Sequence, residues 1–356
     1  MAEIDIRIVG VAGRVTLTRP DALNALSHDM CRAIDAALIA WRDDPDVRLV
    51  VLDAEGDKAF CAGGDLHDLY RTGRAGDYGY GRRFWMDEYR LNARIAEFPK
   101  PVVALMQGFT LGGGVGLGCH AAHRILCESS QISLPECGIG LVPDVGGSLI
   151  LARAPGHLGE YLGISAARLG AGDAIYAGFA DHFIPRALWP DLLNDLQCHG
   201  LEGGLERYCA PPPEARLREE QPKIDALFGV QDLRACLDAL ENEDTEFSAK
   251  ARKRIAQNSP LAMACTFQMI RHLRAREATK GEATIREALA LEYRFSYRAM
   301  EKGDFLEGMR AAVIDKDRAP HWQHSLDSLP QQDVEEMLEP LGADALDFGD
   351  AERETL

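Results

Sequence analysis

The sequence contains no apolar run long enough to cross a membrane, and its first residues, MAEIDIRIVG, lack the basic and apolar segments of an export or transit signal. Its nine cysteines are scattered between Cys31 and Cys265 without a paired framework. Scattered cysteines in a chain of this length are typical of reduced thiols. We therefore expect a cytoplasmic protein that does not enter a membrane.

Positive charge is also scarce, because 39 Lys and Arg residues face 56 Asp and Glu residues, for a net charge of −17. This balance argues against nucleic-acid binding and against adhesion to anionic membranes, since phosphates would be repelled. Backbone N–H groups and a few local Arg or Lys residues could still hold the phosphates of a small ligand. With 46% hydrophobic and 27% charged residues over 356 positions, the composition indicates a globular chain with a substantial core.

Hydrophobic patterning predicts that the chain starts in the order β-β-α-β, in the style of a layered α/β fold. Ser27 is the expected N-cap of the helix. A Gly-, Arg- and Tyr-rich segment at 70–82 suggests an exposed loop or a ragged helix. The expected strands of this first part lie at 4–9, 14–18 and 47–52.

The second part of the sequence is helical almost throughout. A run of three prolines, 211–213, is the clearest linker and marks the change. We therefore predict an α/β core over residues 1–205 and a helical C-terminal region over residues 206–356. The helices expected in this region lie at 227–240, 244–258, 261–276 and 285–298.

Two glycine-rich turns each follow a buried strand. One contains Gly63, Gly64 and Asp65, and the other contains the triple glycine 112–114 after the apolar run 101–106. Close packing of a strand on a helix is one explanation of such turns. The other is a pair of outward N–H groups that converge on one oxygen and hold an anion, either a phosphate or a charge that develops during a reaction.

Two carboxylates, Glu136 and Asp144, each follow a proline in the otherwise apolar segment LPECGIGLVPDVGG. Burial among apolar neighbours would raise the pKa of such a group and suit it to act as base, acid or nucleophile. Helix capping or a loop hydrogen bond is the alternative explanation.

Three further motifs are weak. Gly116–Ala121 matches G-x-G-x-x-A, but Glu128 follows too early for a dinucleotide site. Ser165 lies in a near miss of the G-x-S-x-G elbow and marks the start of a helix instead. Four potential metal ligands crowd an apolar segment without paired C-x-x-C spacing, so buried thiols and core histidines explain them better. These are Cys119, His120, His123 and Cys127.

Taken together, the strings AFCAGGDL, GFTLGGGVGL and LPECGIGLVPDVGG resemble the crotonase (enoyl-CoA hydratase/isomerase) superfamily. The segment LEYRFSYRAMEKGDFLEGMRAAVIDKDRAPHW narrows the resemblance to its 3-hydroxyisobutyryl-CoA hydrolases, the thioesterases of valine breakdown. The resemblance runs from about Ile6 to Phe348. It implies an α/β, crotonase-type spiral of ββα units with a helical C-terminal region that covers the active site.

The resemblance also implies a reaction and its ligand. The substrate would be a small-molecule acyl-CoA ester, so that CoA is part of the substrate and neither a metal nor a redox cofactor is needed. Many crotonases form trimers or hexamers, which makes a homo-oligomer a candidate here, although the longer C-terminal region could block that assembly.

By the same resemblance, the N–H groups of Gly64 and Gly113 would hold the thioester carbonyl. Gly63, Asp65 and Gly112 flank these two donors and would help to bind the substrate. Glu136 would be nucleophile or general base.

The remaining residue roles that the resemblance implies distinguish two reactions. Asp144 would position water or the substrate hydroxyl and help to move a proton, and Glu88 would shape the acyl pocket. Hydratases of the family carry a second catalytic Glu where this sequence has Gly116. The resemblance thus favours hydrolysis of 3-hydroxyisobutyryl-CoA, with 3-hydroxypropionyl-CoA as a second substrate. An enoyl-CoA hydratase or isomerase and a non-catalytic acyl-CoA-binding relative are the alternatives.

Overall fold

The computed structural model describes residues 3–349 and divides them into two compact units. The first comprises the described residues up to Gly64 together with Leu91–Ser133 and Arg168–Glu219. The second comprises Asp65–Arg90, Leu134–Ala167 and the described residues from Glu220 onward. This division differs from the expected one at residues 205 and 206, because two segments of the N-terminal half pack with the C-terminal helices.

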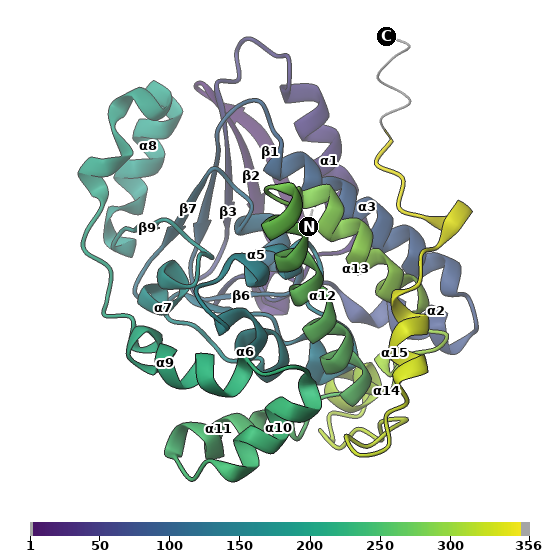
Figure 1. Ribbon diagram of the computed structural model, residues 1–356. Helices are drawn as coiled ribbons and strands as arrows, with labels where there is room; N and C mark the ends of the chain where they lie inside the picture. The colour runs from purple at the N-terminus through teal and green to yellow at the C-terminus, as the bar shows by residue number, and fades with distance from the viewer. Residues whose placement is uncertain (1–2, 350–356) are drawn as a thin grey trace. The chain divides into compact units, whose positions relative to one another are not determined.

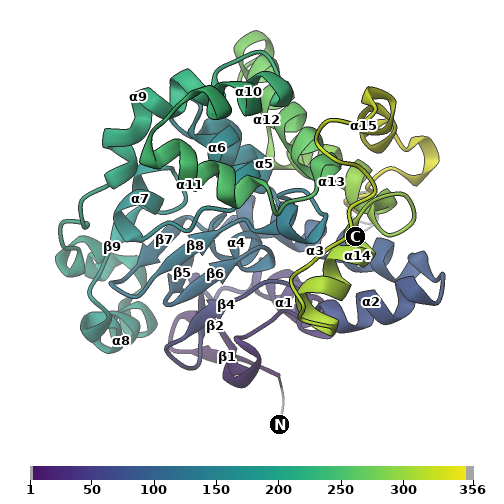
Figure 2. The same cartoon turned by 90° about the horizontal axis from the view of Figure 1, so that it is seen from below.

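The strands of the first unit come in successive pairs along the chain. In the described part of the chain, β1 and β2 form a hairpin at the edge of a six-stranded sheet in the order β1-β2-β3-β5-β7-β9. In each of the next three pairs, the first strand enters this sheet and the second enters a three-stranded sheet, β4-β6-β8 (Figures 1 and 2). Only the pairing of β1 with β2 is antiparallel within these sheets. The strands are β1 (Ile4–Val9), β2 (Ala12–Leu17), β3 (Leu49–Ala54), β4 (Ala59–Cys61), β5 (Val102–Met106), β6 (Phe109–Leu111), β7 (His123–Leu126), β8 (Gln131–Ser133) and β9 (His182–Phe183).

The strands in the middle of the large sheet are buried on both faces, as their continuous apolar runs predict. Alternate residues of β3, β5 and β7, such as Leu49, Val103 and Ile125, belong to one buried cluster with Trp189 and Leu196 of α8 (Trp189–His199). Helix α8 therefore covers that face of the sheet. The other helices of this unit are α1 (His28–Trp41), α4 (Gly113–Gly118) and α7 (Ala171–Tyr176).

The local predictions for this unit are largely confirmed. The chain opens as a hairpin, and the side chain of Ser27 accepts a hydrogen bond from the N–H of Met30 at the start of α1. The second strand begins two residues earlier than expected, and the third begins two residues later. The order β-β-α then repeats along the chain, which is the predicted fold class.

The second unit is built from helices around the long helix α12, which packs on α5, α6, α13 and α15. Close approach of α5 and α6 depends on Gly159, where a Cβ atom would lie 1.9 Å from the carbonyl oxygen of Leu151. The helices are α2 (Leu66–Arg74), α3 (Tyr78–Ala96, here as far as Arg90), α5 (Gly147–Arg153), α6 (Leu158–Ser165), α9 (Arg216–Phe228, here from Glu220), α10 (Leu233–Asn242), α11 (Glu246–Ile255), α12 (Pro260–Lys280), α13 (Ile285–Ala299), α14 (Phe305–Met309) and α15 (Gln331–Leu338).

One expectation about this unit is settled and another needs correction. Residues 70–82 form the ragged-helix alternative, because they lie in α2 and α3 with a break at 75–77, and Thr72 is buried there. The helix expected at 227–240 is interrupted, because the chain leaves α9 at Gly229 and restarts at α10 with Asp232 as N-cap. Here an Asp that seemed to lie inside a helix supplies a cap.

Two further observations concern the whole described range. None of its helices combines the length and the apolarity that a bilayer span needs. All nine cysteines are free thiols, as expected; seven are buried and two, Cys198 and Cys209, are exposed.

We expect Gly114→Ala to destabilise the protein. A Cβ atom at Gly114 would lie 2.2 Å from the carbonyl oxygen of Cys61, so α4 would have to move away from β4. Overpacking of this kind lowers the free energy of unfolding by about 1–3 kcal/mol. The control is Gly203→Ala, where the nearest atom would be 3.7 Å away. Equal urea midpoints for the two variants would contradict the close contact.

Candidate active site

The two glycine turns lie at the carboxyl ends of paired parallel strands in the first unit. Strand β4 pairs with β6 in the register Cys61 to Thr110. Gly64 and Gly113 each follow their paired residue by three positions, and a Cβ atom at Gly63 would lie 3.5 Å from the carbonyl oxygen of Leu111. The strand pairing and this close approach therefore place the two turns side by side.

The backbone N–H groups in these turns differ in what they donate to. Gly112 donates to Ser133, and Val115 and Gly116 donate to the carbonyl of Gly112. Within residues 3–349, neither the N–H of Gly64 nor that of Gly113 donates to a backbone carbonyl. The positive φ angles of Gly63 (109°) and Gly112 (49°) turn the chain just before each donor, a conformation that favours glycine. The turns can thus present two N–H donors to one anionic oxygen.

The predicted carboxylates lie in the second unit. Glu136 begins a 3-10 turn (Glu136–Ile139), and Asp144 lies in the buried segment that leads into α5. Both side chains are only 4% exposed. Asp144 is hydrogen-bonded, whereas Oε2 of Glu136 is buried and has no hydrogen-bond partner among the described residues. That oxygen is therefore free to accept a bond from a ligand.

Helix α3 contributes two neighbouring groups to the same cluster. Glu88 is 3% exposed, and its Oε1 is buried without a hydrogen-bond partner in the described structure. Tyr89 is fully buried, and its hydroxyl donates to Oδ2 of Asp144 at 2.7 Å. Adjacent residues of α3 thus supply one carboxyl and one donor to this cluster.

A further buried carboxylate, Glu292, comes from α13. Its two oxygens accept the N–H of Gly146 at 2.8 Å and the N–H of Ser148 at 3.0 Å, together with the Ser148 hydroxyl. Gly146 and Ser148 flank the start of α5, so Glu292 caps this helix from a distant part of the chain.

The cluster of Glu88, Glu136, Asp144 and Glu292 includes no ion pair with a described basic side chain. Burial raises the pKa of Asp144 to about 7, and the Tyr89 hydrogen bond opposes this shift. Burial, and then the charge of Asp144, raise the pKa values of Glu88 and Glu136 well above the usual range. Burial also raises the pKa of Glu292 to about 8. Burial without a cationic partner thus favours the protonated forms of these carboxyl groups.

The remaining predicted residues have local roles in the structure. Asp65 is the N-cap of α2 and accepts the N–H of His67. Among residues 3–349, Cys119, His120, His123 and Cys127 included, no three His, Cys, Asp or Glu side chains lie close enough together to hold a metal ion. Burial raises the pKa of the Cys119 thiol to about 12, which keeps it protonated. Ser165 ends α6 and is no helix start.

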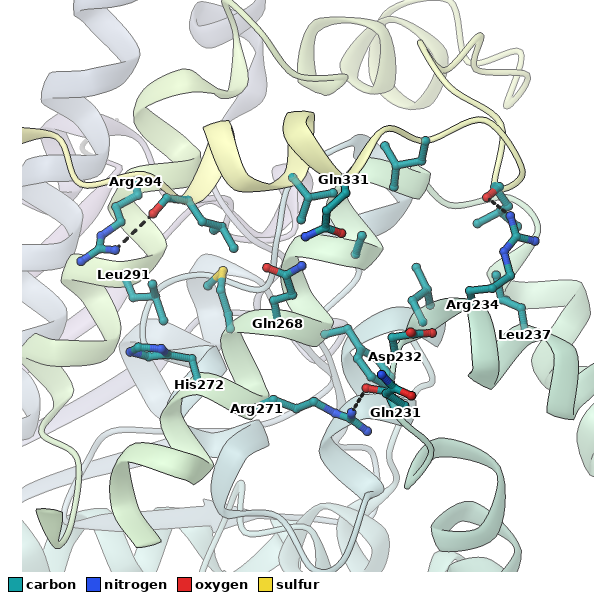
Figure 3. Close-up of a pocket in the computed structure, with 18 residues that line it drawn as sticks. Gln231, Asp232, Arg234, Leu237, Gln268, Arg271, His272, Leu291, Arg294 and Gln331 are labelled. Atoms are coloured by element: carbon teal, nitrogen blue, oxygen red, sulfur yellow. Dashed lines mark hydrogen bonds between the residues drawn. The ribbon is translucent and has the colours of Figure 1, made fainter. Parts of the chain in front are cut away.

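A cavity of about 800 Å³ lies elsewhere in the second unit, between α10, α12, α13 and α15 (Figure 3). Gln268 and Gln331 project toward one another across it, and Arg271 and Arg294 lie at its side. Both arginines donate to backbone carbonyls there. None of the predicted site residues lines this cavity.

Residues 12–338 match the model of the enoyl-CoA hydratase/isomerase family, and the chain belongs to that family. Its relatives include proteins named "3-hydroxyisobutyryl-CoA hydrolase, mitochondrial". The one from Xenopus tropicalis is 37% identical over 89% of this chain and 83% of its own length. The one from Homo sapiens is 34% identical over 97% of this chain and 91% of its own. Both confirm the resemblance inferred from the motifs.

Two solved structures share the fold over nearly the whole chain. An enoyl-CoA hydratase from Rhodobacter sphaeroides 2.4.1 is 54% identical, with a TM-score of 0.92 over 97% of this chain and 100% of that one. A carnitinyl-CoA dehydratase from Mycobacterium thermoresistibile is 34% identical, with a TM-score of 0.92 over 98% of this chain and 99% of that one. The predicted α/β, crotonase-type fold is therefore confirmed.

Sequence reasoning missed the roles of Tyr89 and Glu292. Glu292 fell on the apolar stripe of its helix, with Ile285, Leu289 and Phe295, and was assigned only a helical position. An acid inside a buried stripe was the available signal, because an isolated carboxylate is costly to bury. Tyr89 carried no comparable signal.

We expect Asp144→Asn to stabilise the protein more at pH 8 than at pH 5. The pKa of Asp144 is raised on folding, so its contribution to stability is greatest below the unfolded pKa and falls as the pH rises through about 7. Asparagine cannot ionise. The gain in unfolding free energy should therefore grow by about 2–3 kcal/mol between the two pH values.

Urea denaturation of the wild type and the variant at pH 5 and pH 8 measures this difference. Exposed Asp238→Asn serves as the matched control and should give the same small effect at both pH values. A gain for Asp144→Asn that does not change with pH would contradict the raised pKa of this carboxyl.

Proposed function

We propose that this protein hydrolyses the thioester of 3-hydroxyisobutyryl-CoA to the free hydroxy acid and CoA, with 3-hydroxypropionyl-CoA as a second candidate substrate. The names of the animal relatives support this proposal. The structural observation that carries it is the pairing of Glu136 with Asp144 in one buried cluster, together with Gly116 in α4, where a hydratase of the family would carry an acid. The reaction would be the hydrolytic step of valine degradation.

In this proposal the N–H groups of Gly64 and Gly113 bind the thioester carbonyl oxygen and stabilise the negative charge that develops on it. Glu136, when ionised, attacks the carbonyl carbon and expels the CoA thiolate, or it deprotonates the water that attacks. A proton held by Asp144 passes to the thiolate. On the covalent route, Asp144 then takes a proton from the water that cleaves the Glu136 acyl anhydride.

Glu88 is proposed to shape the acyl pocket, and Gly63, Asp65 and Gly112 to help bind the CoA ester. The bases for these roles are the family resemblance and, for Glu88, its buried unpartnered oxygen. The step needs neither a metal nor a redox cofactor, and CoA enters as part of the substrate. We also keep as predictions a cytoplasmic location, a homo-oligomer and a helical region from residue 206 that covers the site. The animal relatives carry the word mitochondrial in their names.

The second candidate function is hydration or isomerisation of an enoyl-CoA. It is favoured by the name of the 54% identical structure from Rhodobacter sphaeroides. Hydration requires one group to activate water and another to handle the proton at the α-carbon. Gly116 cannot supply the second group, which places this reaction behind hydrolysis.

We expect the purified protein to release free thiol from 3-hydroxyisobutyryl-CoA. Thiol release should continue when EDTA is added to chelate metal ions, because the proposed step needs no metal. Glu136→Gln should reduce the rate by a factor of about 10³ or more, because the amide is neither nucleophile nor base. The matched control is Glu241→Gln on the exposed face of α10, which should keep full activity.

The outcomes separate the candidates. Loss of the enoyl absorbance of crotonyl-CoA without thiol release would support the hydratase and overturn the hydrolase. Binding of CoA esters without turnover of either substrate would indicate a non-catalytic relative. Full thiol release by Glu136→Gln would end the proposed mechanism.

A further inference from the structure

The backbone that follows Asp144 adopts an unusual conformation. Val145 has a φ of 52° and Gly146 a φ of 80°, so two consecutive residues lie in the left-handed region. Glycine tolerates this region, but a β-branched residue rarely adopts it. Such a conformation persists only where surrounding contacts enforce it. The contacts around Asp144 should therefore include groups whose task is to hold this segment.

Glu292 provides the contacts to the backbone. It is fully buried in α13 and accepts the N–H groups of Gly146 and Ser148, on both sides of the residue where α5 begins. The N–H of Gly147, between them, donates to the carbonyl oxygen of Asp144 at 2.7 Å. Three consecutive N–H groups thus have defined acceptors, and two of these acceptors belong to one carboxylate.

Tyr89 provides the contact to the side chain. Its hydroxyl donates to Oδ2 of Asp144 at 2.7 Å and lies 3.2 Å from Oγ of Ser296. Its ring is fully buried and meets the ring of Tyr293 edge-on at 6.0 Å. The phenol therefore reaches Asp144 from a fixed position on α3.

We propose that Glu292 and Tyr89 are positioning residues for Asp144: Glu292 holds the strained backbone at 145–148, and Tyr89 fixes the direction of the carboxylate. This inference rests on the proposed function only where activity is the readout. Neither residue need touch the substrate.

Asp144 is faced by groups from three elements, and a titration experiment has to consider all of them. No described Lys, Arg or His forms an ion pair with Asp144. The facing groups are Glu88 and Tyr89 from α3, Glu136 from the 3-10 turn, and Glu292 and Ser296 from α13.

The first experiment compares Tyr89→Phe with Tyr293→Phe. Tyr89 donates to the ionised form of Asp144, so loss of its hydroxyl should raise the pKa of Asp144 by about one unit. The hydroxyl of Tyr293 donates instead to the carbonyl of Arg82, so its removal should leave Asp144 unchanged. The pKa is measured without substrate by following the NMR chemical shift of the Asp144 carboxyl carbon against pH in protein labelled with ¹³C-Asp. The signal is assigned by its absence from the Asp144→Asn variant.

The same variants are then assayed for thiol release between pH 5 and pH 9. In the proposed mechanism Asp144 must hold a proton to protonate the thiolate, so the alkaline limb of kcat/KM should move up by about one unit in Tyr89→Phe. Above this limb the variant should keep severalfold to tenfold more activity, relative to its own maximum, than the wild type. A general loss of packing would lower activity at every pH and would not move the limb.

The two readouts have separate meanings. An unchanged Asp144 titration in Tyr89→Phe would overturn the role of Tyr89. A shifted titration without any thiol release by the wild type would keep the positioning role and reject the proposed hydrolysis.

The second experiment tests Glu292 by hydrogen exchange. Glu292→Gln keeps the size of the side chain but leaves a single acceptor oxygen for two N–H groups. We expect exchange of peptides that cover 145–148 to become at least tenfold faster, while α12 keeps its protection. Glu335→Gln on the exposed face of α15 is the control. Unchanged exchange at 145–148 in a folded Glu292→Gln variant would overturn the role of Glu292.

Discussion

The second unit is governed by the burial of carboxyl groups that have no cationic partner. A buried charge is expensive unless it is paired or hydrogen-bonded, so such groups keep protons that an exposed acid would lose. Glu292 is stabilised by three donors, Asp144 by one strong donor, and Glu88 and Glu136 each keep an unpartnered oxygen. Glu88 and Glu136 therefore keep an oxygen that can accept a bond from a ligand, whereas the oxygens of Glu292 bind the backbone next to Asp144.

A different constraint organises the first unit, where parallel strand pairing sets the position of both glycine turns. Because β4 and β6 run in the same direction and Cys61 pairs with Thr110, their ends bring Gly64 and Gly113 to corresponding places. The contact between Gly114 and the Cys61 carbonyl leaves no room for a side chain, so α4 starts directly at the end of the sheet. Close packing at the triple glycine is thus confirmed, and it is compatible with the predicted presentation of the Gly113 N–H to an anion.

Much of the architecture could be predicted because it follows from local patterns. The hairpin, the Ser27 cap and the buried strands come from alternation, capping chemistry and apolar runs that act over a few residues. The predictions stay open where distant segments decide the outcome. Residues 70–82 fit a loop or a ragged helix in isolation, and the burial of Leu69 and Thr72 inside the second unit favours the helices α2 and α3 with a break at 75–77.

The sequence by itself determined the residue types on which the chemistry depends: two acids after prolines, two glycine turns and no acid at position 116. These features are local, because glycine loosens and proline restricts the backbone only at its own position and at its immediate neighbours. Only the tertiary structure decided that Glu292 and Tyr89 position Asp144. Glu292 lies 148 positions after Asp144 and Tyr89 lies 55 positions before it, so the two side chains reach this segment only because the helices that carry them pack beside it. It also decided the protonation of the cluster, since a raised pKa depends on which groups share a buried volume and not on their order along the chain.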